Sequence, residues 1–179
     1  YDPVSGKVLL DGKDIKHLTL DSLRSNISLV SQDVFLFNGT VYDNIAFGLK
    51  LKKLPISIIE KKVKSALKMV GMTDYEYRDV DSLSGGETFL ASLSLALALT
   101  DTVQSKKGGI QLDSLFIDEG FGSLDETALE RALQTLDEVR ENRSVGIISH
   151  VSELKQRDFN RVEVDKTTVG SSIRVKILG

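Results

Sequence analysis

The sequence predicts an α/β protein built around a mostly parallel sheet. An apolar strand over residues 115–117 is followed by an amphipathic helix over 127–140 and by a second apolar strand over 145–148. Strand, helix and strand in that order are typical of a right-handed parallel crossover. Residues 89–99 add a helix that is apolar on nearly every side, which indicates that it is buried in the core.

The sequence of the first third of the chain predicts short strands and turns. Apolar residues 7–10 end at the turn pair Asp11-Gly12, which indicates a small antiparallel part near the N-terminus. Residues 27–30 form a second short apolar run. Residues 42–47 fit either one helical turn or a loop.

Two further elements complete the expected fold. A helix follows Pro55, with Ser57 and Glu60 as its capping box. At the other end of the chain, two short apolar runs flank Gly170 and predict a hairpin.

Length and composition indicate one ordinary globular domain. The chain has 179 residues, of which 41% are hydrophobic and 27% are charged, as in proteins that bury a core without staples. Its net charge of -3 gives no general attraction to nucleic acid or anionic membranes. The lack of cysteine excludes disulfides and thiolate metal sites. The longest apolar stretch, residues 89–99, is too short to span a bilayer. We therefore expect a soluble, cytoplasmic protein.

The first motif with chemical meaning is Leu83-Ser84-Gly85-Gly86-Glu87. Ser84 and Glu87 have the spacing of a capping box and therefore predict a helix start. The glycines allow the backbone to approach an anion closely, and a helix N-terminus attracts phosphate. A plain glycine turn with a capping box is the structural alternative. The complete pentapeptide before a buried helix favours a functional interpretation.

The second motif is the acid pair Asp118-Glu119, which ends the apolar run 115–117. Parallel strands bind ligands beyond their carboxyl ends. The first carboxylate can hold Mg²⁺, and the second can polarise a water molecule for attack on phosphorus. Two acids that merely solvate a strand end are the structural alternative, so this motif is weak by itself.

Two single residues complete the set of candidates. His150 follows the apolar run 145–148, where an imidazole can hydrogen-bond a transferring phosphate. Gln32 follows the run 27–30, where an amide can reach a metal ion or water. A strand-end histidine and a loop glutamine with no role in chemistry are the ordinary alternatives.

Taken together, these motifs resemble those of the ABC ATPase family. Gln32, Leu83–Glu87, Leu115–Glu119, Ser123-Leu124-Asp125 and His150 follow the order of its Q-loop, signature, Walker B, D-loop and H-switch. The resemblance implies a P-loop-NTPase-like ABC ATPase core formed by one domain. That domain has three parts. Residues 1–50 form exporter-like strands and the Q-loop, residues 51–82 form a helical region, and residues 83–179 form a lobe with the signature, Walker B, D-loop and H-switch. The last part is similar to the C-terminal lobe of an SbcC-type DNA-repair exonuclease subunit.

The resemblance also implies a role for each motif around ATP and Mg²⁺. Asp118 would support the metal ion together with Gln32, and Glu119 would be the general base. His150 would contact the γ-phosphate, and Gln32 the attacking water. The residues expected to face a partner's nucleotide or the dimer seam are Ser84, Gly85, Gly86, Glu87 and Asp125.

One family motif is missing. The sequence contains no G-x-x-x-x-G-K-[ST], the Walker A loop that cradles phosphates. A single preorganised donor to developing charge contributes about 3–4 kcal/mol. We therefore expect the isolated chain to bind ATP weakly and to hydrolyse it negligibly.

Several functions remain open on this basis. The first is an ATPase engine that an upstream segment or a partner with Walker A completes, and a homodimer or such a partner chain is the expected assembly. The second is a non-catalytic or hybrid interaction module. The third is a DNA-contacting repair subunit, and the ATPase domain of an ABC transporter is a further alternative. Family analogy adds a nuclease subunit and DNA as partners for the repair-like half.

Overall fold

The computed structural model describes residues 3–25, 27–31, 35–104, 114–141, 144–157, 159–168 and 170–177. The chain forms two compact units, Tyr1–Ile148 and Ser149–Gly179. Within the described residues, no helix has the length and apolar character needed to cross a membrane.

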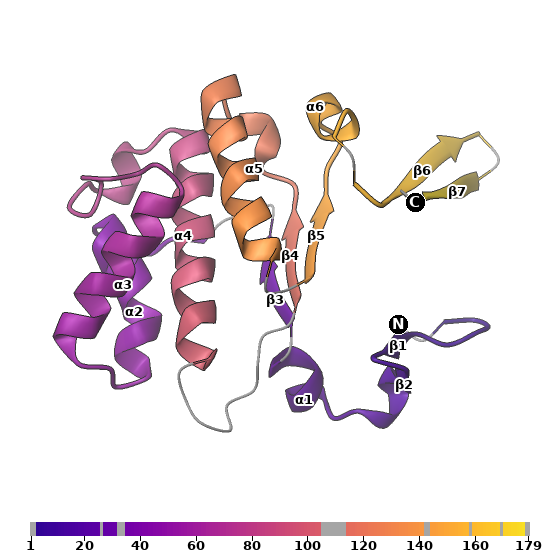
Figure 1. Cartoon of the computed structure of the whole chain (residues 1–179), viewed down its shortest axis with the longest axis horizontal. Coiled ribbons are helices and arrows are strands. Elements are labelled where there is room, and N and C mark those ends of the chain that lie inside the picture. Colours follow the sequence, from indigo (N-terminus) through magenta and orange to yellow (C-terminus); the bar gives the residue numbers. More distant parts are fainter. Residues whose placement is uncertain are drawn as a thin grey trace. The chain divides into compact units, whose positions relative to one another are not determined.

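The first unit contains a three-stranded parallel sheet (Figure 1). Its strands are β3 (Ile27–Val30), β4 (Ser114–Asp118) and β5 (Ser144–Ile148), in the order β3-β4-β5. The helix α5 (Glu126–Arg140) connects β4 to β5. The predicted parallel arrangement of the two apolar strands is therefore confirmed.

One face of this sheet is covered by helices. The helix α4 (Gly85–Gln104) contacts β3, and α5 contacts β5, on the same side of the strands (Figure 1). Side chains alternate between the faces of a strand, and on β4 the buried ones are Leu115 and Ile117. The central position of α4 explains why its sequence is apolar on nearly every side.

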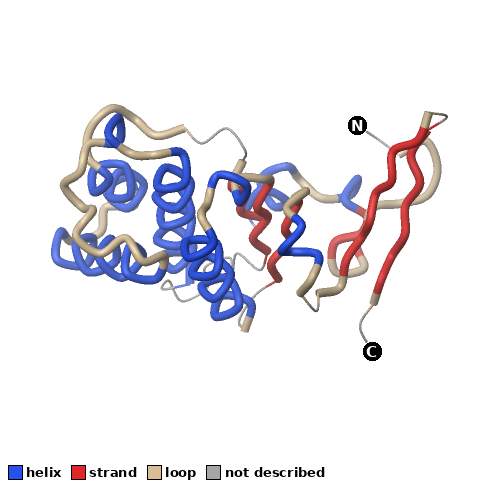
Figure 2. Tube along the Cα trace, turned by 90° about the horizontal axis from the view of Figure 1, so that it is seen from above, coloured by secondary structure: helices blue, strands red, loops and turns tan. Residues whose placement is uncertain are grey.

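A helical layer packs on α4, away from the sheet (Figure 2). It consists of α2 (Val41–Leu51) and α3 (Ile56–Met69), followed by the 3₁₀ turn η2 (Val80–Ser82). Fully buried side chains of this layer include Val41, Ile45, Leu49, Val63 and Leu67.

The structure refines two expectations in this layer. Residues 42–47 belong to an eleven-residue helix, α2, whose N-cap is Thr40. The capping box predicted from Ser57 and Glu60 is wrong, because α3 begins one residue before Ser57. Pro55 takes the N-cap position there, and it offers no side-chain acceptor.

The N-terminal segment forms small elements. The strands β1 (Leu9–Leu10) and β2 (Lys13–Asp14) pair antiparallel across Asp11-Gly12, as predicted. Both turn residues have positive φ, 48° and 75°. The 3₁₀ turn η1 (Ile15–His17) and the helix α1 (Leu20–Ser25) follow before β3.

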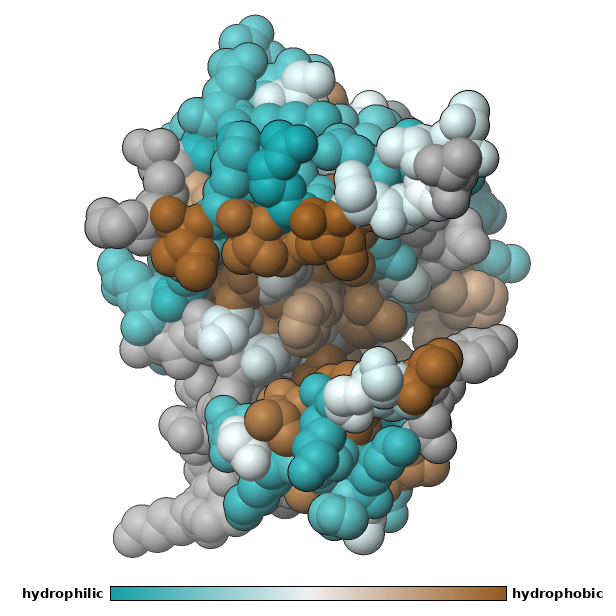
Figure 3. Space-filling model, turned by 90° about the vertical axis from the view of Figure 1, so that its right-hand side faces the viewer, coloured by the Kyte–Doolittle hydropathy of each residue, from teal (hydrophilic) through white to brown (hydrophobic). Residues whose placement is uncertain are grey.

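The second unit contains the short helix α6 (Ser152–Lys155) and the hairpin of β6 (Arg161–Thr167) and β7 (Gly170–Lys176). One face of the hairpin carries ion pairs, including Lys176 with Glu163 at 2.9 Å and Arg174 with Asp165 at 3.5 Å. Apolar side chains form an exposed row bordered by hydrophilic ones (Figure 3). The exposed apolar residues of the hairpin are Val162, Val164, Ile173 and Val175.

Candidate functional site

The start of α4 has the geometry that the sequence predicts. The backbone N–H of Ser84 donates to Glu87 Oε2 at 2.8 Å, and the N–H of Glu87 donates to Ser84 Oγ at 3.3 Å. These reciprocal bonds form the expected capping box. Ser84 and Gly85 are exposed, so the positive end of a twenty-residue helix faces solvent.

Gly86 holds this helix start against the segment that follows the acid pair. A β-carbon at Gly86 would come to 2.8 Å of the carbonyl oxygen of Ser123. Real β-carbons are essentially never found at this distance, and the neighbour is backbone, which cannot rotate away. Gly86 is therefore required by close packing as well as by its place in the motif.

The acid pair lies at the carboxyl end of β4. Asp118 is the last residue of the strand, and Glu119 and Gly120 both have positive φ, 61° and 95°. The backbone N–H of Glu119 donates to the carbonyl of Ile148 at the end of β5 at 2.9 Å. The left-handed conformation costs conformational energy at Glu119, which is not a glycine, and such residues often occur at functional sites.

Phe89 connects the signature helix to this turn. Its ring centroid lies 5.1 Å from that of Phe121, in an edge arrangement. Phe89 and Phe121 are both buried. The turn after the acid pair therefore packs directly on the second turn of α4, and the two motifs share one rigid core.

Asp125 has a local structural role. Its Oδ1 accepts the N–H of Ala128 at 2.7 Å, which makes it the N-cap of α5. Ser123, two residues earlier, donates its hydroxyl to the carbonyl of Gly120 at 2.7 Å. The expected place of Asp125 at a dimer seam stays a prediction.

The roles expected for the other two candidates stay predictions. His150 is exposed and belongs to the second unit, two residues after β5. Gln32 lies outside the described residues. The described unit therefore brings together Ser84–Glu87, Asp118–Glu119 and Ser123–Asp125.

The donor set fits one part of a Mg-ATP site. A carboxylate such as Asp118 is a suitable ligand for Mg²⁺, which keeps waters and phosphate oxygens as its other ligands. Among the described residues, no cluster of three or more His, Cys, Asp or Glu side chains offers an all-protein metal site. The chain therefore supplies the acidic edge and a helix start but lacks the Walker A cradle.

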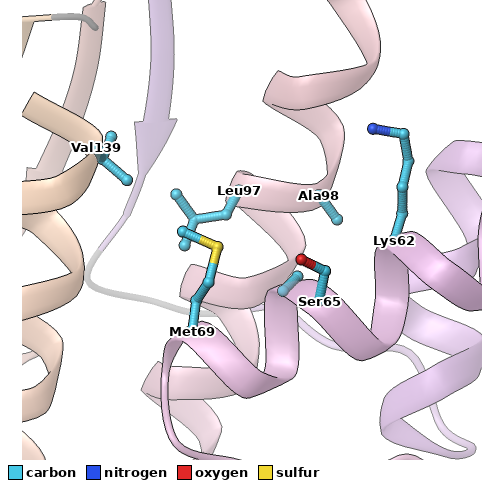
Figure 4. Close-up of a pocket in the computed structure, with 7 residues that line it drawn as sticks. Lys62, Ser65, Met69, Leu97, Ala98 and Val139 are labelled. Atoms are coloured by element: carbon cyan, nitrogen blue, oxygen red, sulfur yellow. The ribbon is translucent and has the colours of Figure 1, made fainter. Parts of the chain in front are cut away.

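A small pocket elsewhere does not compete with this site. It lies among α3, α4 and α5 and has a volume of about 30 Å³ (Figure 4). Met69, Leu97 and Val139 line it together with Lys62. Ligand pockets usually measure roughly 300–1,000 Å³, so this one is a packing defect rather than a nucleotide site.

Sequence reasoning missed residues that support the motifs. The hydroxyl of Tyr75 donates to Glu87 Oε1 at 2.7 Å, and Arg78 lies 3.7 Å from the same oxygen. Both belong to the irregular segment between α3 and η2, where no period identifies inward-facing residues. These bonds lower the pKa of Glu87 below its ordinary value of 4.5, chiefly through the backbone bond from Ser84 and then the bond from Tyr75.

Comparison with known families agrees with the motifs. Residues 61–138 match the family model described as SbcC/RAD50-like, Walker B motif. The chain is 59% identical over 93 residues to the SbcC subunit of the nuclease SbcCD from Treponema pallidum, covering 51% of this chain and 9% of that protein. It is 55% identical over 152 residues to the protein of the same name from Vibrio cholerae, covering 83% and 15%. The chain thus spans less than a sixth of either relative.

Solved structures of ABC ATPases are similar to most of the chain. The cbiO1 protein of Clostridium perfringens, part of an ABC transporter complex, aligns with a TM-score of 0.67 and 27% identity over 84% of this chain and 58% of that one. A bacterial Atm1-family ABC exporter with ATP bound aligns with a TM-score of 0.67 and 28% identity, covering 86% and 26%.

Proposed function

Because this chain is an ABC-type ATPase segment similar to SbcC, we propose that it forms one half of an ATP-binding and ATP-hydrolysing core. A Walker A segment, from a partner or from another part of a longer protein, supplies the other half. The observation that carries this proposal is an uncovered apolar sheet face that ends at the acid pair.

Among the described residues, the face of the sheet opposite α4 and α5 has no covering layer, and we call it the uncovered face. The register of the strands places Leu29, Phe116 and Ile148 on this face, and they are 63%, 40% and 56% exposed. Purely parallel sheets are normally covered on both faces, so this face requires a further layer. Asp118 follows Phe116 by two residues and therefore projects to the same side of the sheet.

A Walker A segment fits the chemistry of that layer. Its phosphate loop is followed by a helix whose N-terminus binds phosphate. A helix on the uncovered face that begins at the carboxyl edge would place its phosphate loop beside Asp118. The missing motif and the missing layer are then accounted for by the same segment.

The chain's own residues divide the chemistry in this proposal. Mg-ATP, when bound, supplies the metal and the phosphoryl group. Asp118 would contribute a carboxylate to the metal, and Glu119 would accept a proton from water as the general base. His150 would contact the terminal phosphate, and Gln32 the water or metal. Ser84–Glu87 present the N-terminus of α4 to the nucleotide of a second copy across a dimer, with Asp125 at the seam.

The repair branch is favoured over the transporter branch. The relatives from Treponema pallidum and Vibrio cholerae, both more than half identical over the matched residues, are subunits of a nuclease, although the similar solved structures are transporter ATPases. Phe89 occurs where transporters usually carry a polar residue, and it packs on Phe121 beneath the acid pair. By this similarity, a nuclease subunit and DNA are the proposed partners of the complete protein.

Turnover after complementation tests the proposal. A segment that carries a G-x-x-x-x-G-K-[ST] loop is co-expressed with this chain, and phosphate release from Mg-ATP is measured. We expect turnover in the co-purified complex, its loss in Glu119→Gln, and none from either part alone. A stable complex without turnover would favour the non-catalytic interaction module, which the missing Walker A loop also supports.

A further inference from the structure

A cluster around Glu87 connects the helical layer to the exposed start of α4. Both carboxylate oxygens of Glu87 are engaged, Oε2 by the N–H of Ser84 at 2.8 Å and Oε1 by the hydroxyl of Tyr75 at 2.7 Å. The guanidinium of Arg78 lies 3.7 Å from Oε1 and 3.9 Å from the centroid of the Tyr75 ring. The side chain of Glu87 is 28% exposed, so the cluster is partly sheltered from water.

The segment that carries Tyr75 and Arg78 is itself anchored. The carbonyls of Glu76 and Arg78 accept the N–H groups of Tyr42 and Val41 at 2.8 Å and 3.0 Å, at the first turn of α2. Met72 is buried, and its N–H donates to Leu67 near the end of α3 at 2.8 Å. A shift of α2 or α3 therefore moves Tyr75 and Arg78 as well.

This arrangement constrains the direction of the helix start. Without Tyr75 and Arg78, the Glu87 carboxylate is free to adopt other rotamers, and its bond to the Ser84 N–H becomes intermittent. Ser84 and Gly85 are exposed at the start of α4. The carbonyl of Ser84 accepts the N–H and the hydroxyl of Thr88 at 2.8 Å and 2.9 Å, whereas the bond to Glu87 Oε2 holds the N–H side of Ser84. Charge-assisted hydrogen bonds are the stronger kind, which makes this fixation effective.

We propose that Tyr75 and Arg78 are positioning residues, which hold Glu87 so that the backbone of Ser84 and Gly85 faces the nucleotide in a fixed orientation. They couple the helical layer of α2 and α3 to the nucleotide contact. This inference rests on the proposed function, because it assigns the start of α4 a nucleotide to face.

The test compares two tyrosine variants in the same segment. Tyr75→Phe removes the hydroxyl that binds Glu87 and keeps the ring beneath Arg78. Tyr77→Phe is the matched control, since Tyr77 is 82% exposed and its ring stacks on Tyr42, contacts that need no hydroxyl. Hydrogen exchange of the Ser84 amide is measured by NMR in the chain alone, and the KM and kcat for Mg-ATP are measured in the complemented complex.

We expect Tyr75→Phe to accelerate exchange at Ser84 by about tenfold, the loss of one hydrogen bond to a charged group. The KM for Mg-ATP should rise in the complex, while Tyr77→Phe matches the wild type in both assays. An unchanged exchange rate at the Ser84 amide in Tyr75→Phe would overturn the inference. A faster exchange rate with unchanged KM and kcat for Mg-ATP would also overturn it, because the cluster would then have only a structural role. A wild-type complex without turnover would instead overturn the proposed function, and the inference with it, whatever the exchange data.

Discussion

The backbone of Gly120 lies directly against the ring of Phe89, so that a β-carbon on Gly120 would clash with Phe89 Cδ2. Gly120 also has a φ of 95°, which side-chain-bearing residues rarely adopt. The contact joins the helix that begins at the signature motif to the turn that carries Asp118 and Glu119. The geometry of the two motifs is therefore mutually dependent.

Substitution of Gly120 should show this dependence. We expect Gly120→Ala to lower the free energy of unfolding by about 3 kcal/mol, because about 1–2 kcal/mol of backbone strain adds to overpacking against Phe89. Gly12→Ala is the control, since Gly12 has a φ of 75° but no neighbouring atom within 4 Å. Denaturant unfolding measures both. Equal costs would mean that the Phe89 ring moves aside freely and that the contact joins nothing.

The uncovered sheet face provides a second prediction. Leu29→Lys should change the free energy of unfolding by less than about 0.5 kcal/mol, because the side chain is already 63% exposed. It should nevertheless weaken co-purification of the Walker A segment, since a charge would be buried in the new layer. Leu51→Lys, at a leucine of 68% exposure on α2, is the matched control. Retention of the segment by both variants would place its binding site elsewhere.

Two substitutions of Asp125 distinguish its role as a helix cap from a role at the dimer seam. Asp125→Ala should lower the free energy of unfolding by about 1 kcal/mol through loss of the N-cap, whereas Asp125→Asn keeps an acceptor for the Ala128 N–H. Thermal melts check this difference. If Asp125 also serves the seam through its charge, Asp125→Asn should reduce ATP-dependent dimerisation in sedimentation, and undiminished dimerisation would confine Asp125 to the cap.

The acid stability of the helix start follows from the lowered pKa of Glu87. A carboxyl whose pKa is lower in the folded state adds stability that is present above its unfolded value and is lost as pH falls through the folded one. The ordinary value is 4.5, so exchange at the Ser84 amide should stay constant above this pH and accelerate below it, after correction for intrinsic exchange. Glu87→Gln should remove that dependence. An unchanged pH profile in Glu87→Gln would assign the effect to another group.

The sequence alone predicts the elements whose signals are local. Strict apolar runs specify β4 and β5, and the spacing of Ser84 and Glu87 specifies the start of α4. Local signals fail where tertiary context decides. Ser57 has the residue type of a cap, yet α3 already begins at Ile56, with Pro55 at the N-cap position.

The same distinction between local and tertiary signals applies to the candidate site. Its motif residues can be identified from their type and their order in the sequence. Tyr75 and Arg78, in contrast, lie twelve and nine positions before Glu87, and they reach it only through the fold. The packing of Phe89 on Gly120 is equally non-local. No period or motif connects such pairs, because only the folded chain brings them together.

The most direct test of the central claim is Mg-ATP binding by calorimetry, with Glu119→Gln present throughout to prevent turnover. The chain alone and the chain with its Walker A segment are titrated under the same conditions, after circular dichroism has verified that both are folded. We predict no measurable binding to the chain alone and micromolar binding to the complex, since the phosphate cradle comes from the added segment. Micromolar binding by the chain alone would contradict the claim that it is half of an ATPase core.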